Sequence, residues 1–424
     1  MKKNSVCNAI GISVSLHILM FLYIYSVQLK GIPFGLGTRI FIALLGLVAV
    51  LLFFLLSLLN GNKTLKIKEN LFTILVLLGL IASISILSVL INGTSDFEFI
   101  KYMISIILIL FACYFITSAI RGEHKDNSFS VLSDLIINVV LIQVILSLLM
   151  FLIPSFKITL NNIQLVSDFD KLKLDEAATL YRLSGFGAKF FGAGIVNGYA
   201  LMLIAAQIKL GELSYKRVIY LSIVFLIILV FGMMMARTTV IGALLAFIIV
   251  TFPSGLKIKL RLFQKKLFFM VSLVILPLVA TIVLFFIFPK FADTLKSAFN
   301  FGFKIFLSND NGGGDTETLS QLKDMYIWPS SLRTYIIGDG YYTNPTPHPL
   351  YYMNTDVGYL RLIYYFGLIG MLSYVFLQFS VIRMALEKNA KFKMFFYMTF
   401  VYLLILNFKG FSDLLFLSVL FLMI

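Results

Sequence analysis

Four arginines in this sequence have the chemistry to bind a phosphate-bearing ligand. Arg182, Arg237 and Arg361 lie at or near the ends of apolar segments, and Arg333 lies shortly before Gly338-Asp339-Gly340 in the stretch between two of them. Arginine presents a planar fork of donors that fits phosphate in a bidentate manner, and it keeps its charge when desolvated. Four such groups at one level of a membrane would suit a diphosphate. Each also has a simpler interpretation: Arg182 and Arg333 could be solvated loop residues, Arg237 could snorkel from a helix end, and Arg361 could pair with Asp356.

Two further side chains could take a proton from a hydroxyl group. His348 lies in Pro345-Thr346-Pro347-His348-Pro349, where it could act as a base near neutral pH or be a solvated loop residue. Asp356 precedes an apolar run, where it could be a base or a helix N-cap. The three histidines and the scattered acids show no metal-ligand spacing, so we expect no metal and no cofactor.

The composition indicates a membrane protein. Of the 424 residues 60% are hydrophobic and only 13% are charged, and the mean hydropathy is +0.98. A water-soluble protein of this length needs far more polar surface. The formal net charge of +15 does not indicate nucleic-acid binding, because the basic residues lie in short segments between apolar runs, with no nucleic-acid-binding module around them. Basic cytoplasmic loops and an anionic ligand explain the charge better.

The apolar runs predict an all-α polytopic membrane protein with about twelve transmembrane helices, since one span needs about 20 mostly apolar residues. The first run follows Met1-Lys2-Lys3 like a signal peptide. It is too long and lacks a small-residue cleavage pattern, so we interpret it as the first span. The predicted spans are 6–28, 39–59, 71–91, 99–120, 130–153, 190–208, 217–235, 237–252, 267–288, 357–382, 394–407 and 411–424.

The distribution of Lys and Arg predicts how these spans are oriented. Every second loop is basic, from Lys2 and Lys3 at the start to Lys391 and Lys393 near the end. Basic loops stay in the cytoplasm. We therefore expect both termini in the cytoplasm, with 1–424 forming a single integral membrane domain.

Two long loops, 154–189 and 290–356, are then expected on the outer side, which is also where the four arginines would gather. In the second, larger loop, the aromatic and basic stretch Leu295–Leu307 suits a helix lying in the membrane interface. Thr316–Tyr326 has helical spacing, and Gly338-Asp339-Gly340 predicts a tight turn.

Three stretches form an ordered pattern around these residues. The first is Arg182-Leu183-Ser184-Gly185-Phe186-Gly187, and the second is Ala236-Arg237-Thr238-Thr239. The third runs from Ile337-Gly338-Asp339-Gly340-Tyr341 through Thr355-Asp356-Val357-Gly358 to Phe366-Gly367-Leu368-Ile369-Gly370. In order, spacing and topology they resemble the O-antigen polymerase and ligase superfamily of membrane glycosyltransferases, with Ala236 where serine is more usual. The resemblance covers roughly residues 180–380.

The resemblance implies a GT-C-like helical bundle in the bacterial inner (cytoplasmic) membrane and an enzyme of lipopolysaccharide biosynthesis. An O-antigen polymerase moves the growing chain from its undecaprenyl diphosphate carrier onto a fresh lipid-linked repeat unit at the periplasmic face, without a metal. We hypothesise that Arg182, Arg237, Arg333 and Arg361 bind the diphosphates of the donor and acceptor lipids. Arg182 and Arg237 count as catalytic because they stabilise the leaving group, and Asp356 or His348 would deprotonate the acceptor hydroxyl.

The expected partners are the undecaprenyl-diphosphate-linked oligosaccharide and membrane lipids, with a chain-length regulator and a flippase as possible protein partners. Other functions stay open. An O-antigen ligase would pass the same chain to lipid A core, and a capsule or exopolysaccharide polymerase would use similar chemistry. A flippase or transporter of lipid-linked sugars belongs to a different class. The chain lacks the repeated halves typical of transporters and the ring of pore charges typical of channels.

Overall fold

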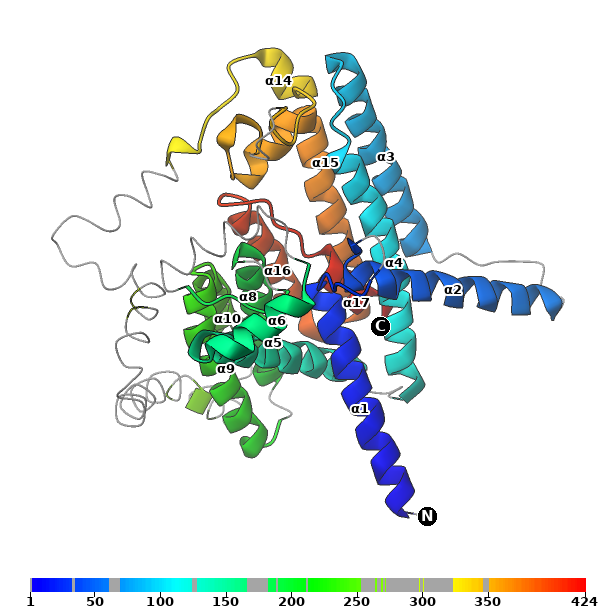
Figure 1. The fold of residues 1–424 in the computed structure, drawn as a ribbon, viewed down its shortest axis with the longest axis vertical. Helices are drawn as coiled ribbons and strands as arrows, with labels where there is room; N and C mark the ends of the chain where they lie inside the picture. Colours follow the sequence, from blue (N-terminus) through cyan, green and yellow to red (C-terminus); the bar gives the residue numbers. More distant parts are fainter. Residues whose placement is uncertain are drawn as a thin grey trace. The chain divides into compact units, whose positions relative to one another are not determined.

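The computed structural model describes residues 2–32, 35–60, 69–123, 128–165, 182–187, 190–210, 213–252, 323–345 and 351–424, and the single residues 264, 268, 269, 271, 297 and 300. Regular structure in these ranges is helical, and the extended pairings there are isolated bridges, Leu29 with Gln164 and Thr343 with Tyr351. The helices (Figure 1) are α1 (Lys2–Tyr25), α2 (Thr38–Leu59), α3 (Glu69–Asn92), α4 (Glu98–Glu123), α5 (Ser128–Leu152), α6 (Pro154–Ile163), α8 (Phe190–Leu210), α9 (Tyr215–Met235), α10 (Thr239–Thr251), α14 (Leu332–Ile337), η3 (Tyr352–Asn354), α15 (Gly358–Lys388), η4 (Ala390–Phe392), α16 (Lys393–Leu406) and α17 (Leu415–Met423).

Seven of the described helices are long and apolar enough to cross a membrane: α2, α3, α4, α5, α8, α9 and α15. Two shorter apolar helices, Val14–Tyr25 within α1 and Thr239–Thr251, accompany them. The chain is therefore a polytopic α-helical membrane protein, as its composition predicts. Every predicted span overlaps a described helix except 267–288, which lies outside the described residues apart from 268, 269 and 271.

The chain packs as two compact units, each assembled from separate stretches of sequence. The first unit comprises Met1–Leu36, Phe129–Asp315 and Lys391–Tyr402. The second comprises Gly37–Ser128, Thr316–Ala390 and Leu403–Ile424. Arg182 and Arg237 belong to the first unit, whereas Arg333, Asp356 and Arg361 belong to the second.

Small residues allow close packing around α8 in the first unit. This helix is buried along nearly its whole length and packs on α9 and α10. A Cβ atom on Gly198 would come within 3.2 Å of the Cα atom of Gly242 and 2.7 Å of the Tyr402 ring. The Tyr402 hydroxyl donates to the carbonyl of Gly194 over 3.0 Å. Glycine contacts and interhelical hydrogen bonds of this kind are typical of membrane helix bundles.

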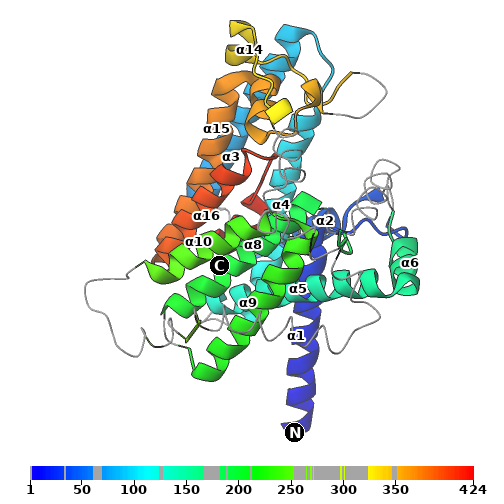
Figure 2. The same cartoon turned by 90° about the vertical axis from the view of Figure 1, so that its left-hand side faces the viewer.

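The longest helix of the second unit, α15, is broken near its beginning. It packs on α3 and α14, which lie beside it in the view of Figure 2, and on α17. Phe366 has φ −142° and Gly367 has φ 72°, and neither value is helical. The break separates a short first part, Gly358–Phe366, from a long second part. The second part alone is long enough to span a bilayer, since a span needs about 20 residues.

The two predicted outer loops contain helices of their own. Helix α6 lies within 154–189, and α14 and η3 lie within 290–356. The predicted turn at Gly338-Asp339-Gly340 is present, because both glycines have positive φ, at 82° and 73°. The predicted interfacial helix Leu295–Leu307 lies outside the described residues apart from 297 and 300, and of Thr316–Tyr326 only 323–326 is described.

The break in α15 gives a prediction for stability. Replacing Gly367 by Ala should lower the free energy of unfolding by roughly 1–3 kcal/mol, because an L side chain at positive φ is strained. Its Cβ would also lie 2.5 Å from the carbonyl carbon of Ile336. Thermal unfolding in nanodiscs measures the effect. Gly79→Ala is the matched control, since this glycine of α3 has open space beside it. Equal unfolding temperatures for the two variants would contradict the claim that the break in α15 requires glycine at position 367.

Candidate functional site

A buried arginine enclosed by aromatic rings stands in the second unit. Arg361 lies in the first part of α15, and only 8% of it is exposed. Its guanidinium carbon lies 3.5 Å from the ring centroid of Tyr351, 4.2 Å from that of Tyr342 and 5.9 Å from that of Phe411. Its Nε atom is buried and has no hydrogen-bond partner among the described residues. We call Arg361, Tyr342, Tyr351 and Phe411 the arginine box.

The charge of Arg361 is not balanced by an acid in the described part of the chain. The ion pairs found there involve other residues, so the alternative interpretation, in which Arg361 pairs with Asp356, is wrong. Burial raises the pKa of Tyr342 to about 12, although Arg361 opposes this shift. The phenol therefore stays neutral at physiological pH and cannot supply a counter-charge. Cation–π contacts offset part of the cost of burying the guanidinium, at about 0.5–2 kcal/mol each.

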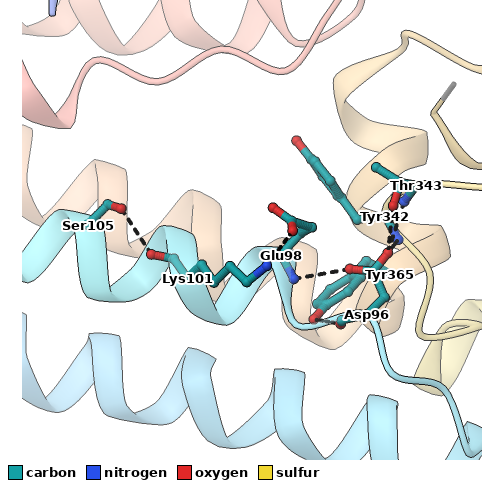
Figure 3. Close-up of polar contacts among 7 residues, drawn as sticks. All are labelled: Asp96, Glu98, Lys101, Ser105, Tyr342, Thr343 and Tyr365. Atoms are coloured by element: carbon teal, nitrogen blue, oxygen red, sulfur yellow. Dashed lines mark hydrogen bonds and ion pairs between the residues drawn. The ribbon is translucent and has the colours of Figure 1, made fainter. Parts of the chain in front are cut away.

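Asp96 holds Tyr342 in place (Figure 3). This residue lies between α3 and α4, and its Oδ2 atom accepts hydrogen bonds from the backbone amides of Tyr342, at 2.8 Å, and Thr343, at 3.0 Å. The Thr343 hydroxyl donates to the same oxygen over 3.2 Å. The Tyr365 hydroxyl donates to the Asp96 carbonyl over 2.8 Å. One carboxylate thus fixes the backbone that carries one wall of the arginine box.

The break in α15 provides further attachment for the same loop. A break after Tyr365 leaves helix carbonyls free to accept other donors. The Asp339 amide donates to the Tyr364 carbonyl over 2.6 Å, and the Gly340 amide donates to the Tyr365 carbonyl over 3.2 Å. The Asp339 carboxylate accepts hydrogen bonds from the hydroxyls of Thr334 and Tyr352. Burial, and then the negative charge of Asp339, raise the pKa of Tyr352 to about 12.

The loop between α16 and α17 supplies Phe411, the third wall. The side chain of Asn407 donates to the Ser412 hydroxyl over 2.7 Å and accepts from the Ser412 amide over 3.2 Å. The next residue, Asp413, accepts a hydrogen bond from the Tyr102 hydroxyl over 2.5 Å. These bonds hold the residues directly after Phe411, whose ring lies beside Arg361.

Arg333 lies on the surface of the second unit, at the end of α3. It is exposed, and its NH2 group donates to the carbonyl of Ile91 over 3.3 Å and to the side chain of Asn92 over 3.0 Å. Both acceptors lie at the end of α3, where a positive charge is favourable. Arg333 therefore attaches α14 to the end of α3.

In the first unit, Arg182 lies at the turn between α9 and α10, which also carries Arg237. The Nε atom of Arg182 donates to the carbonyl of Met235 over 2.6 Å, and its guanidinium carbon lies 4.2 Å from the centroid of the Phe190 ring. Met235 is the last residue of α9 and lies two positions before Arg237, which is half-buried. Arg182 therefore lies beside the turn that carries Arg237.

Two buried polar atoms lie at the same turn. The side-chain oxygens Oδ1 of Asn197 and Oγ1 of Thr238 have no hydrogen-bond partner in the described ranges. We call Arg182, Arg237, Asn197 and Thr238 the corner group. It combines two cations with two buried oxygen atoms that have no hydrogen-bond partner among the described residues.

The two predicted bases have different outcomes. Asp356 is exposed, and its carboxylate makes no hydrogen bond or ion pair with the described residues. It does not cap α15, because the N-cap position is Val357 and the nearby hydroxyl of Thr355 accepts the Val357 amide over 3.3 Å. The alternative interpretation of Asp356 as a cap is thus wrong. His348 lies outside the described residues.

The sequence did not point to Asp96, Tyr342, Tyr351 or Phe411. Tyrosine pairs at 341–342 and 351–352 were visible as a signal, but nothing in the sequence linked them to Arg361. Among the described residues, no three His, Cys, Asp or Glu side chains gather so that they could hold a metal ion. Comparison with known protein families, characterised proteins and solved structures finds no match for this chain.

The role of Asp96 can be tested by hydrogen–deuterium exchange. Asp96→Asn should speed exchange of the amides of Tyr342 and Thr343, because an amide group cannot accept as well as a carboxylate, whose charge strengthens both bonds. Glu98→Gln is the control, since Glu98 pairs only with exposed Lys101 among the described residues. Unchanged exchange at 342–343 in the Asp96 variant would show that another contact holds the loop.

Proposed function

We propose that the chain is an O-antigen polymerase that joins undecaprenyl-diphosphate-linked repeat units. The observation that carries this proposal is the arginine box. A guanidinium buried without an acid costs several kcal/mol unless a ligand compensates for it. In a membrane protein, the suitable ligand is an anionic headgroup that arrives with its lipid. A diphosphate can accept bidentate hydrogen bonds from the free guanidinium edge.

The finer architecture belongs to the same proposal. The chain would cross the inner membrane about twelve times as a GT-C-like bundle, with 154–189 and 290–356 as periplasmic loops and both termini in the cytoplasm. The alternating basic loops support this orientation. With this orientation, Arg182, Arg237, Arg333 and Arg361 would serve the periplasmic face.

The proposed reaction is a single displacement. The hydroxyl oxygen of the acceptor sugar attacks the anomeric carbon of the donor chain, the bond from that carbon to the diphosphate oxygen breaks, and the anomeric configuration inverts. Asp356 or His348 takes the hydroxyl proton. Arg361, Arg333, Arg182 and Arg237 stabilise the negative charge on the diphosphates, the kind of electrostatic contribution that dominates many catalysed reactions.

An O-antigen ligase would use the same groups with lipid A core as the acceptor. A flippase for the lipid-linked sugar is a second candidate of another class, and the break in α15 favours it, since transporters often place discontinuous helices at their binding sites. The presence or absence of a new glycosidic bond separates the polymerase from the flippase.

Purified protein in liposomes, supplied only with an undecaprenyl-diphosphate-linked repeat unit of its host, should yield a ladder of longer lipid-linked glycans. A ladder that forms without added proteins supports the polymerase. Product formed only after lipid A core is added indicates the ligase. Transfer of the intact substrate across the bilayer without any new bond indicates the flippase, and this result would overturn the proposal.

Variants of Arg361 test the assigned site in the same assay. Arg361→Ala should lower the polymerisation rate about a hundredfold or more, as expected when a group that stabilises developing charge is removed. Arg361→Lys should recover only part of the rate, because lysine keeps the charge but loses the planar fork. Arg383→Ala is the control, since this arginine of α15 pairs with Glu387 on an exposed surface. Wild-type ladders from Arg361→Ala would remove Arg361 from the site.

A further inference from the structure

Residues 326–337, which include α14, carry an exposed apolar face. Trp328 is 60% exposed, Leu332 is 76% exposed and Ile336 is 50% exposed. Leu332 and Ile336 lie four residues apart on α14, so they share one face of this helix. We call these three side chains the anchor face.

The opposite side of this segment is packed against the protein. Tyr326 and Tyr335 contact the cluster that Val357, Leu360 and Ile363 form on the first part of α15. The segment therefore has a packed side and an apolar exposed side, a division typical of helices that lie in a membrane interface.

The position of α14 relative to α3 sets the level of the anchor face. Arg333 binds the carbonyl of Ile91 and the side chain of Asn92, the last residues of α3. Helix α14 thus lies beside the end of a helix able to span the membrane, as both views of the fold show (Figures 1 and 2). Leu87, Leu90 and Ile91 at this end of α3 are themselves exposed. Exposed apolar side chains therefore stand both on α14 and on the adjoining end of α3.

We propose that the anchor face is inserted into the membrane interface, at the boundary between headgroups and acyl chains beside the end of α3. Tryptophan prefers this boundary, because its ring is apolar and its N–H group is polar. Insertion removes three large apolar side chains from water. It also fixes the depth of the following loop, 338–343, which carries Tyr342 of the arginine box. The inference needs only the membrane character of the chain and does not rest on the proposed enzyme activity.

The test uses native fluorescence, since Trp328 is the single tryptophan of the chain. The full-length protein is placed in phosphatidylcholine bilayers whose acyl chains carry bromine either near the headgroup or near the chain end. Trp328 should lose most of its emission with the shallow bromine, less with the deep bromine, and little with iodide in the water. Trp328→Phe should abolish the signal.

A depth reference makes the result quantitative. Leu80→Trp, introduced together with Trp328→Phe, places the reporter at an exposed position in the middle of α3, where the deep bromine should quench more than the shallow one. In the native chain, replacing Leu332 and Ile336 by Asp should shift quenching of Trp328 from the bromines towards iodide. These positions are exposed, so the change leaves the packed side intact.

Two results would overturn the proposal. Strong quenching of Trp328 by iodide with no effect of brominated lipid would place the anchor face in water. Emission that neither quencher reaches would mean that protein covers the face, either a second copy of this chain or another partner.

Discussion

A positive charge buried among neutral rings is the constraint on which the second unit depends. Arg361 is nine-tenths buried, its Nε atom has no partner within the described residues, and the rings around it cannot balance its charge. Such a group is unfavourable in a ligand-free protein. It persists because the surrounding backbone is fixed from three directions: by Asp96, by the broken part of α15 and by the loop that carries Phe411.

The break at Phe366 and Gly367 links the membrane span to the site. A continuous α15 would use the carbonyls of Tyr364 and Tyr365 within the helix, and the loop containing Asp339 and Gly340 would lose two backbone acceptors. The break therefore frees acceptors for the loop and separates the spanning part of the helix from the part that carries Arg361. One local departure from helical geometry positions both Arg361 and the loop that carries Tyr342.

The sequence predicts the helices well, because lipid leaves a spanning segment few alternatives to an α-helix. Arg361 could also be identified, since a charge within an apolar run needs a reason. Its surroundings could not be identified. Tyr342 and Tyr351 lie in the segment before α15 and Phe411 lies in the loop after α16, and Tyr342 reaches Arg361 only because Asp96 and the break in α15 hold its loop. Gly367 alone does not predict the break, because most glycines in membrane helices leave the helix continuous. The position of Asp356 before an apolar run also suggests a helix cap, but the Thr355 hydroxyl is the side-chain group that accepts the Val357 amide at the start of α15.

Unfolding of Arg361→Met, with and without undecaprenyl diphosphate, tests the central claim most directly. If the guanidinium is kept unpaired for an anionic lipid headgroup, the variant without lipid should be at least as stable as the wild type. The wild type should gain about 2.7 kcal/mol at a lipid concentration about one hundred times its Kd, and the variant should gain far less. A wild type that does not respond to the lipid, together with a strongly destabilised variant, would make Arg361 a structural residue and contradict the account.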